Sequence, residues 1–196
     1  MQQQTTYGAL TLITPSAAVS AAVHGGRAKC LQRLVRLDMP VPVTVALSFD
    51  AVHEVAIGNL PDMQALLAPF GDAPLLSVRP SSQDPDWGGP SAILNVGMND
   101  ARLGELTQRI GAEPATKLYM RFVQSYAIHV ARLDPDEFHL PDVADAGGLK
   151  MMLDAFEFET DEPFPQDPAV QLAEVLRSMA RAWDGTTARL LRQARG

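Results

Sequence analysis

The stretch PLLSVRPSSQDPDWGGPSAILNVGMND, at positions 74–100, limits the folds open to this chain more than any other segment. Its two short apolar runs, 75–78 and 93–96, enclose a polar segment rich in proline and glycine. This pattern is typical of two strands joined by a loop. The chain that follows has apolar residues at helical spacing, so the sequence predicts a fold that combines strands with helices.

Arg79 stands at the end of the first apolar run. A charged residue in that position is costly unless it is solvated or paired, and a guanidinium fork suits phosphate oxygens. Two interpretations stay open: Arg79 binds a phosphate, or it forms a salt bridge with Asp84 or Asp86 of the loop. Trp87, beside the loop glycines, is expected to pack against the protein rather than to contact a nucleobase.

A second candidate feature is HGGRAK, at positions 24–29, where Gly25 and Gly26 precede a run with helical spacing. Glycines before a helix let backbone N–H groups approach an anion, and the positive end of the helix dipole favours it. Arg27 and Lys29 would then stand in the first helical turn. The segment lacks the pattern of a Walker A loop, and glycines also end loops for structural reasons, so this feature alone does not predict a phosphate site.

Composition narrows the class of protein. The chain has 196 residues, 46% of them apolar, which suits one main domain with a smaller lobe. Its formal charge of −7 argues against nonspecific nucleic-acid binding. No apolar run approaches the length of about 20 residues that spans a bilayer, and the start lacks the basic segment of a secretory signal, so we expect a cytoplasmic protein without membrane contact.

Cysteine and histidine give no sign of a metal centre. Cys30 is the single cysteine and is expected to be a small buried apolar residue. The four histidines lie in different predicted elements without the spacing of zinc ligands, and no serine or cysteine stands in the context of a catalytic nucleophile. We therefore expect neither a metal site nor catalytic residues in this chain.

Charge is unevenly spread along the chain. Between Asp134 and Glu174 twelve acidic side chains stand against Lys150, whereas five arginines stand against Asp184 within 177–195. The favoured interpretation is a solvated acidic face, followed by a helix whose basic residues complement its dipole. The alternative is that the basic tail contacts an acidic partner.

Periodicity and capping residues predict the other elements. In chain order they are strands at 8–14 and 43–47, helices at 49–57 and 62–70, a helix capped by Asn99, helices at 115–132 and 149–158, and a last helix opened by Asp167 and Pro168. The proline- and acid-rich segment 134–146 is the linker candidate. Several aromatic side chains fall at helical spacing and are expected in the core: Phe122, Tyr126, Phe156, Phe158 and Trp183.

Six segments of the chain resemble, in order, segments from the N-terminal region of pyruvate, phosphate dikinase. They are HGGRAKCL, RLDMPVPVTV, SVRPSS, DWGGPSA, ILNVGMND and MRFVQSYA, and the later FPQDPAVQLAEVLRSMARAWDGTTAR is similar to a further helix of that family. The resemblance covers nearly the whole chain, with the part between 133 and 163 shortened. It implies the first lobe of an ATP-grasp-like domain.

The resemblance also implies a site. In the family, a lysine after the paired glycines and the arginine of the strand contact ATP phosphates, and a glycine loop closes over them. Arg27 matches the lysine position, Arg79 the arginine and Gly88 the loop glycine. With Gly26 and Lys29 of the glycine-led helix, they form the predicted ATP-binding set.

Departures from the family pattern weaken the site. Arg27 replaces a compact ammonium with a larger fork, and Pro80 removes a backbone donor where phosphate contacts are wanted. In the loop tail, Ser91 and Ala92 stand where the family has an acidic and a hydroxyl side chain. We therefore expect a degenerate phosphate site.

The expected fold is α+β, the first lobe of an ATP-grasp-like domain. Residues 1–100 plus 163–196 are predicted to form that lobe, with a small mixed sheet and flanking helices. Residues 101–162 are predicted to form an inserted helical subdomain.

For function, the resemblance implies a truncated pyruvate, phosphate dikinase-like protein with a degenerate ATP- or phosphate-binding lobe. Family members continue into a second lobe with acidic metal ligands, then a phosphohistidine domain and a pyruvate-binding barrel. We therefore expect that this chain alone does not hold Mg²⁺, and that phosphotransfer needs a partner that supplies the missing lobe. Whether the chain is itself an enzyme, and whether it forms a homo-oligomer, stay open. The alternative is a non-catalytic regulatory or interaction module that has lost nucleotide binding.

Overall fold

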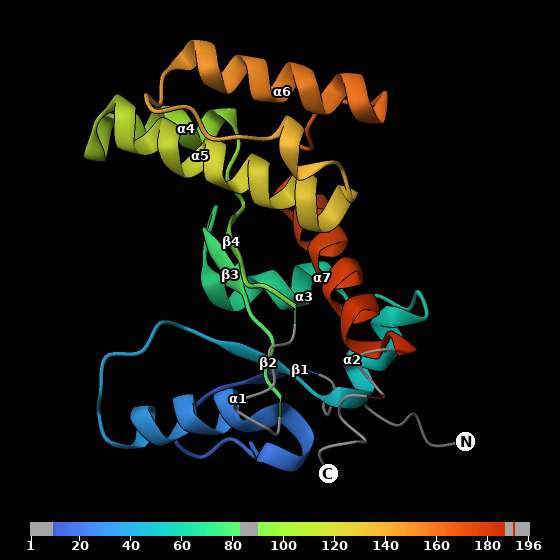
Figure 1. The fold of residues 1–196 in the computed structure, drawn as a ribbon. Coiled ribbons are helices and arrows are strands. Elements are labelled where there is room, and N and C mark those ends of the chain that lie inside the picture. Colours follow the sequence, from blue (N-terminus) through green and yellow to red (C-terminus); the bar gives the residue numbers. More distant parts are fainter. Residues whose placement is uncertain (1–9, 83–89, 187–189, 191–196) are drawn as a thin grey trace. The chain divides into compact units, whose positions relative to one another are not determined.

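The computed structural model of the chain describes residues 10–82, 90–186 and 190, and it is an α+β structure as predicted (Figure 1). Short strands come early in the chain, and long helices dominate after residue 100. The elements are β1 (Leu10–Leu12), α1 (Ala21–Arg36), β2 (Val45–Leu47), α2 (Phe49–Ala56), α3 (Met63–Leu67), the 3₁₀ turn η1 (Ala68–Phe70), β3 (Leu76–Val78), β4 (Ile93–Val96), α4 (Asp100–Ile110), α5 (Ala112–Tyr126), the π turn η2 (Ala127–Ala131), the 3₁₀ turn η3 (Pro135–Glu137), α6 (Ala146–Thr160) and α7 (Pro168–Asp184).

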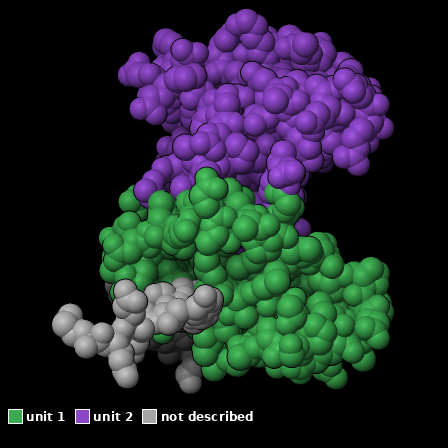
Figure 2. Space-filling view, turned by 180° about the vertical axis from the view of Figure 1, so that it is seen from behind, with its two compact units in different colours: residues 1–71, 80–90, 179–196 green, residues 72–79, 91–178 purple. Residues whose placement is uncertain are grey.

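Two compact units make up the chain (Figure 2). The first unit comprises residues 1–71, 80–90 and 179–196, and the second comprises 72–79 and 91–178. The second unit thus takes in β3, β4 and most of α7, and not only the segment predicted to be a helical subdomain. Compactness does not show which segments fold as a domain, so the division predicted from the sequence stays a prediction.

Within the described residues the strands form two separate antiparallel pairs instead of the expected small mixed sheet. In the first unit β1 pairs with β2, and Leu10 lies opposite Leu47. In the second unit β3 pairs with β4, and Leu76 lies opposite Val96. Pro80 has no backbone N–H to donate, which limits how far the β3 ladder can continue.

The core of the first unit is small and aliphatic. It consists of buried Ile13, Val19, Ala28 and Ala46, with Ala17, Leu31 and Val35 packed against it. Gln32 of α1 is fully buried beside this core, and its amide nitrogen donates to the backbone oxygens of Thr14 and Ala17. The loop between β1 and α1 is therefore held by hydrogen bonds as well as by apolar contact.

The core of the second unit is aromatic. α5 packs against α4, α6 and β4. Phe164 lies at the centre of the ring contacts, with centroid distances of 5.6 Å to Phe122, 5.2 Å to Tyr126, 5.2 Å to Phe156 and 6.0 Å to Tyr119. The prediction that Phe122, Tyr126 and Phe156 pack in the core is confirmed.

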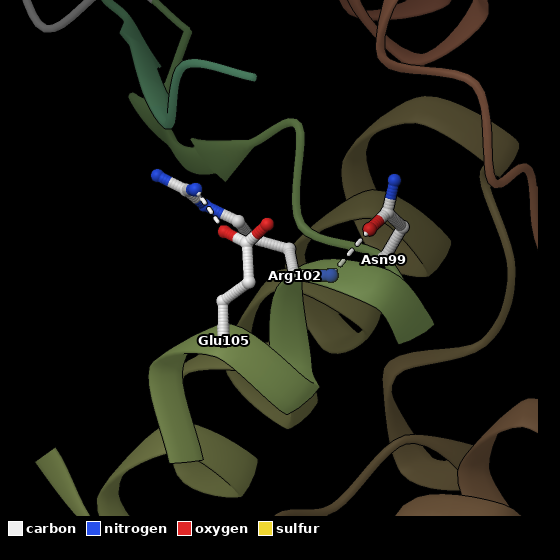
Figure 3. A network of polar contacts seen from close by, with 3 residues as sticks. All are labelled: Asn99, Arg102 and Glu105. Atoms are coloured by element: carbon white, nitrogen blue, oxygen red, sulfur yellow. Dashed lines mark hydrogen bonds and ion pairs between the residues drawn. The ribbon is translucent and has the colours of Figure 1, made fainter. Parts of the chain in front are cut away.

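Both predicted helix caps of the second unit are confirmed. The Asn99 side chain accepts a hydrogen bond of 2.8 Å from the Arg102 N–H at the start of α4, and the Arg102 guanidinium pairs with Glu105 one turn later (Figure 3). The Asp167 side chain accepts one of 2.8 Å from the Ala169 N–H at the start of α7. Each cap satisfies a backbone donor that has no partner inside its helix.

Three predictions about individual segments are wrong. Cys30 is exposed, because α1 turns Ala28 and Gln32 toward the core and Cys30 lies on the other face. Phe158 is also exposed, since α6 buries Leu149, Met152 and Phe156 instead. The linker candidate 134–146 packs within the second unit: Phe138 is fully buried, and its carbonyl accepts a hydrogen bond of 2.7 Å from the Gln124 amide.

None of the helices in the described ranges combines the length and apolar character needed to cross a bilayer.

Candidate functional site

A glycine breaks α1 near its start. Ser20 caps the first turn by accepting a hydrogen bond of 3.2 Å from the Val23 N–H, and the helix is then interrupted at Gly25, where φ is +82° and ψ is 166°. A Cβ atom at Gly25 would lie 1.8 Å from the backbone oxygen of Ser81. Both the positive φ and the close backbone approach therefore require glycine at this position.

The segment 80–82 lies against the start of the second part of α1. The Gly26 N–H donates to the Ser82 carbonyl at 2.6 Å, and the Ala28 N–H donates to the Ser81 hydroxyl at 3.1 Å. These bonds bring HGGRAK and the end of SVRPSS together within the first unit. They also use two of the N–H groups that a helix start otherwise offers to an anion.

Arg27 takes part in the same contact. Its Nε donates to the Pro80 carbonyl at 3.0 Å, and its side chain is exposed. No hydrogen bond to another described residue involves the two terminal guanidinium nitrogens. Within the described residues, Arg27 thus holds the chain at Pro80 through one nitrogen of its guanidinium group.

Lys29 points to a different place. Its Nζ donates to the Val19 carbonyl at 3.0 Å and to the Gln32 side-chain oxygen at 3.1 Å. Those partners belong to the β1–α1 loop and to α1 itself, so Lys29 braces the same loop that Gln32 holds.

Arg79 follows β3 directly and belongs to the second unit, and its side chain is exposed. It makes no hydrogen bond or ion pair with another residue of the ranges 10–82, 90–186 and 190. Asp84 and Asp86, the alternative partners, lie outside the described residues, as do Trp87 and Gly88. Whether Arg79 meets a phosphate or a carboxylate stays a prediction, and so does its convergence with Arg27.

His24 is a buried residue of this site that the sequence analysis did not single out. It is 4% exposed, its Nδ1 accepts a hydrogen bond of 3.4 Å from the Ser20 N–H, and its Nε2 lies 3.2 Å from the Thr11 hydroxyl. Because Nδ1 is an acceptor, Nε2 is the ring nitrogen that donates to the Thr11 hydroxyl. His24 therefore ties β1 to the first turn of α1.

Ser81 and Ser82 were also missed. Serine is a common helix cap, but these residues lie more than fifty positions after the helix residues that they contact, Ala28 and Gly26. Capping is recognisable in sequence when cap and helix are adjacent, so no local signal marks this pair.

A second set of polar contacts joins ILNVGMND to FPQDPAVQL in the second unit. The Gln171 side chain is fully buried; its oxygen accepts from the Gly97 N–H at 2.8 Å, and its nitrogen donates to the Met98 and Pro165 carbonyls at 2.9 Å and 2.6 Å. The Asn99 amide donates to the Gln166 carbonyl at 2.9 Å. These side chains hold the turn before α4.

Metal-ligating side chains do not gather in the part of the chain that the structure describes: no group of three or more His, Cys, Asp or Glu residues there could hold an ion.

Comparison with known proteins gives a partial match. No protein-family model matches the chain. It is similar to the pyruvate, phosphate dikinase of Clostridium symbiosum, with 26% identity over 208 residues that cover 86% of this chain and 24% of that protein. It is also similar to the pyruvate, phosphate dikinase of Rhizobium meliloti strain 1021, with 27% identity over 195 residues that cover 81% and 22% respectively.

The fold and these contacts define an α+β protein in which α1 is interrupted at Gly25 and residues 80–82, which follow β3, pack against it. Identity at the level of these two matches supports a distant relationship with pyruvate, phosphate dikinases. The chain spans less than a quarter of the length of these relatives.

Proposed function

We propose that this chain is a degenerate phosphate-binding lobe, related to part of pyruvate, phosphate dikinase, that binds the phosphates of ATP. The contact between residues 26–28 and 80–82 is the observation that carries the proposal. It joins the two segments in which the resemblance puts phosphate-contacting arginines, and Arg79 directly precedes Pro80, whose carbonyl Arg27 bonds.

Arg27 and Arg79 have the main roles in this proposal. The terminal nitrogens of Arg27 suit two oxygens of one phosphate, because a guanidinium presents its donors as a planar fork. Arg79 is exposed and supplies a second positive charge. Gly26 and Gly88 allow close backbone approach, whereas Lys29 contributes only if a ligand draws it from the Val19 carbonyl.

The whole dikinase reaction is not assigned to this chain. The proposed lobe binds ATP and needs a partner protein, which supplies the metal-binding acidic residues, for any phosphoryl transfer. Positive groups and metal ions share the stabilisation of charge in that reaction, so arginines alone bind the nucleotide without completing the site.

Calorimetric titration with ATP, with and without Mg²⁺, tests this function. We expect saturable binding of ATP that changes little with Mg²⁺. Arg79→Ala should weaken this binding at least about tenfold, since a hydrogen bond to a charged group is worth about 1.5–3 kcal/mol. Arg121→Ala, which removes an exposed arginine of α5, is the matched control and should bind as the unmodified protein does. Absence of binding, or an equal loss in both variants, would overturn the proposal.

One observation favours a second candidate, a non-catalytic regulatory or interaction module that has lost nucleotide binding. The Gly26 and Ala28 N–H groups already have acceptors in Ser82 and Ser81. If those bonds persist at all times, ATP must compete with the chain itself. In that case Ser81→Ala, which removes one of the competing acceptors, should restore measurable ATP binding to a protein that otherwise binds none.

A further inference from the structure

The solvent side of α6 carries two large apolar side chains. Met151 is 73% exposed and Phe158 is 83% exposed. They lie seven residues apart, two turns along one face, opposite the face that buries Met152 and Phe156. Single exposed apolar residues need no explanation, but two that share a helix face form a contact surface. We name this surface the α6 face.

The α6 face is acidic at its edges. Asp154 and Glu157 stand beside its two apolar residues and are exposed, and Glu159 is exposed on the same helix. Lys150 offsets one of these charges through its ion pair with Asp154. A surface of this kind fits a helix that is apolar at its centre and basic at its edges.

α1 carries such a surface. Cys30, Leu34 and Leu37 lie four and then three residues apart on the solvent side, and Leu34 and Leu37 are 36% and 64% exposed. Arg27 and Arg33 flank them and are exposed. From residue 21 to residue 36 the helix has three arginines and one lysine and no acidic residue. We name Cys30, Leu34 and Leu37 with these two arginines the α1 face.

We propose that the α6 face of one copy of this chain docks on the α1 face of a second copy. Both members of the complementary pair are present once on every chain, so a second copy always offers the matching surface. If each copy gives its α6 face and receives on its α1 face, the contact forms twice and closes a two-fold dimer. The two central apolar pairs supply the attraction, and the charged edges set the orientation. This inference does not rest on the proposed function.

Sedimentation velocity over a range of protein concentration tests the association. We expect conversion of a 21.2 kDa monomer into a species of twice that mass. The double variant Met151→Ser with Phe158→Ser should raise the dimer dissociation constant at least about tenfold, because buried aromatic anchors dominate interface energetics. Ile57→Ser removes a 59% exposed apolar residue of the first unit outside both faces and should leave the dissociation constant unchanged.

A charge exchange tests which faces meet. Arg33→Glu and Glu157→Arg should each weaken the homodimer, since each opposes like charges at one edge. An equimolar mixture of the two variants should dimerise again, because the mixed pair has one unmodified contact and one with both charges reversed. Failure of the mixture to recover, when both single variants are folded, would overturn the pairing of α6 with α1.

Cys30 gives a direct readout. With Met151→Cys, a short bifunctional maleimide should link Cys30 of one copy to the new thiol of the other and give a product of dimer mass. Lys117→Cys on α5 is the matched control and should give little such product. A monomer at every concentration overturns the proposal. That outcome includes the case where the chain's own arginine-rich segment 189–195, or another protein, covers the α6 face. A cross-link at monomer mass also overturns the proposal.

Discussion

The second unit buries a cluster of aromatic rings around Phe164, whereas the first unit buries short aliphatic side chains and alanines. An aromatic side chain removes about 150–250 Å² from water, several times the area of an alanine. Hydrogen bonds between segments add to the small core of the first unit: Gln32 holds the β1–α1 loop, and residues 80–82 hold the start of α1. Each such bond adds about 0.5–1.5 kcal/mol.

This difference bears on the proposed phosphate site. The segments proposed to contact phosphate lie in the first unit or enter it at residue 80. Regions that bind ligands are drawn from the less stable part of a protein, because binding needs local freedom that a dense core does not allow. The comparison predicts that changes in the aromatic core cost far more than changes in the contacts of the first unit.

The largest expected effect is that of Phe122→Ala. Phe122 is fully buried and contacts Tyr126 and Phe164, so its loss should reduce the free energy of unfolding by about 3–5 kcal/mol. Phe158→Ala is the matched control at a protein concentration where the chain is monomeric: it removes the same side chain from an 83% exposed position and should change stability by about 0.5 kcal/mol or less. Urea unfolding followed by circular dichroism measures both. Equal losses in the two variants would mean that the aromatic cluster is not the main support of the second unit.

The next effect is that of Gly25→Ala. A Cβ there meets the Ser81 backbone at 1.8 Å and φ is +82°, so we expect a loss of about 1–3 kcal/mol from strain and from displacement of residues 80–82. Tryptophan fluorescence should detect it, since Trp183 belongs to the first unit.

Gly104→Ala is the matched control for that substitution. Gly104 lies inside α4 with no atom within 4 Å of an added Cβ, so alanine there should stabilise the protein by about 0.5–1 kcal/mol. If Gly25→Ala also proves neutral or stabilising, residues 80–82 do not pack against α1 in solution.

Local signals predicted most of the fold. Asn99 and Asp167 cap helices that begin next to them, and the apolar runs at 76–78 and 93–96 are strands because alternation and turn residues act within a few positions. Which face of a helix is buried is harder to predict. Phe158 has the helical spacing of a core residue, yet Phe156 and Met152 of the same helix face the core. The sequence of α6 contains two apolar stripes, and tertiary packing determines which of them is buried.

The candidate site was predictable only in part. HGGRAK and SVRPSS each gave a local signal, and the first unit does bring their neighbouring residues together. That Ser81 and Ser82 would satisfy the N–H groups of Ala28 and Gly26 was not predictable, since the bonds join residues more than fifty positions apart. The same long-range contact explains why Gly25 is needed. The sequence suggested that glycine leaves room for an anion, whereas in the structure the Ser81 backbone lies against Gly25.

The third prediction concerns pH and the second unit. Burial raises the pKa of Tyr119 and of Tyr126 above the ordinary value of 10.0, and nearby Asp100 and Glu174 add to the shift. Both tyrosines are thus neutral in the folded protein at a pH where the unfolded chain begins to lose these protons. Their contribution to stability is complete below pH 10 and is lost as pH rises above it. Urea unfolding at about pH 8 and about pH 11 should show this fall.

Substitution of the two tyrosines tests whether they cause this fall in stability at high pH. In the variant with both Tyr119→Phe and Tyr126→Phe, the fall between these pH values should be much smaller, although stability at about pH 8 drops because the Tyr119 hydroxyl no longer donates to Asp100 or accepts from Gln166. An unchanged fall in this variant would assign the alkaline sensitivity to other groups and remove one distinction between the two units.

The smallest expected effect is that of Ser81→Ala. The Ser81 hydroxyl accepts one hydrogen bond of 3.1 Å, from the Ala28 N–H, and its loss should cost about 0.5–2 kcal/mol, as the loss of a helix cap does. Ser77→Ala, which removes an exposed hydroxyl of β3 in the second unit, should cost less. Hydrogen exchange gives the sharper readout, because the Ala28 amide should lose protection in Ser81→Ala while the amides of α5 keep theirs. Loss of protection in α5 as well would show that the two units unfold as one, and that the contacts of the first unit are not a separately adjustable support for a ligand site.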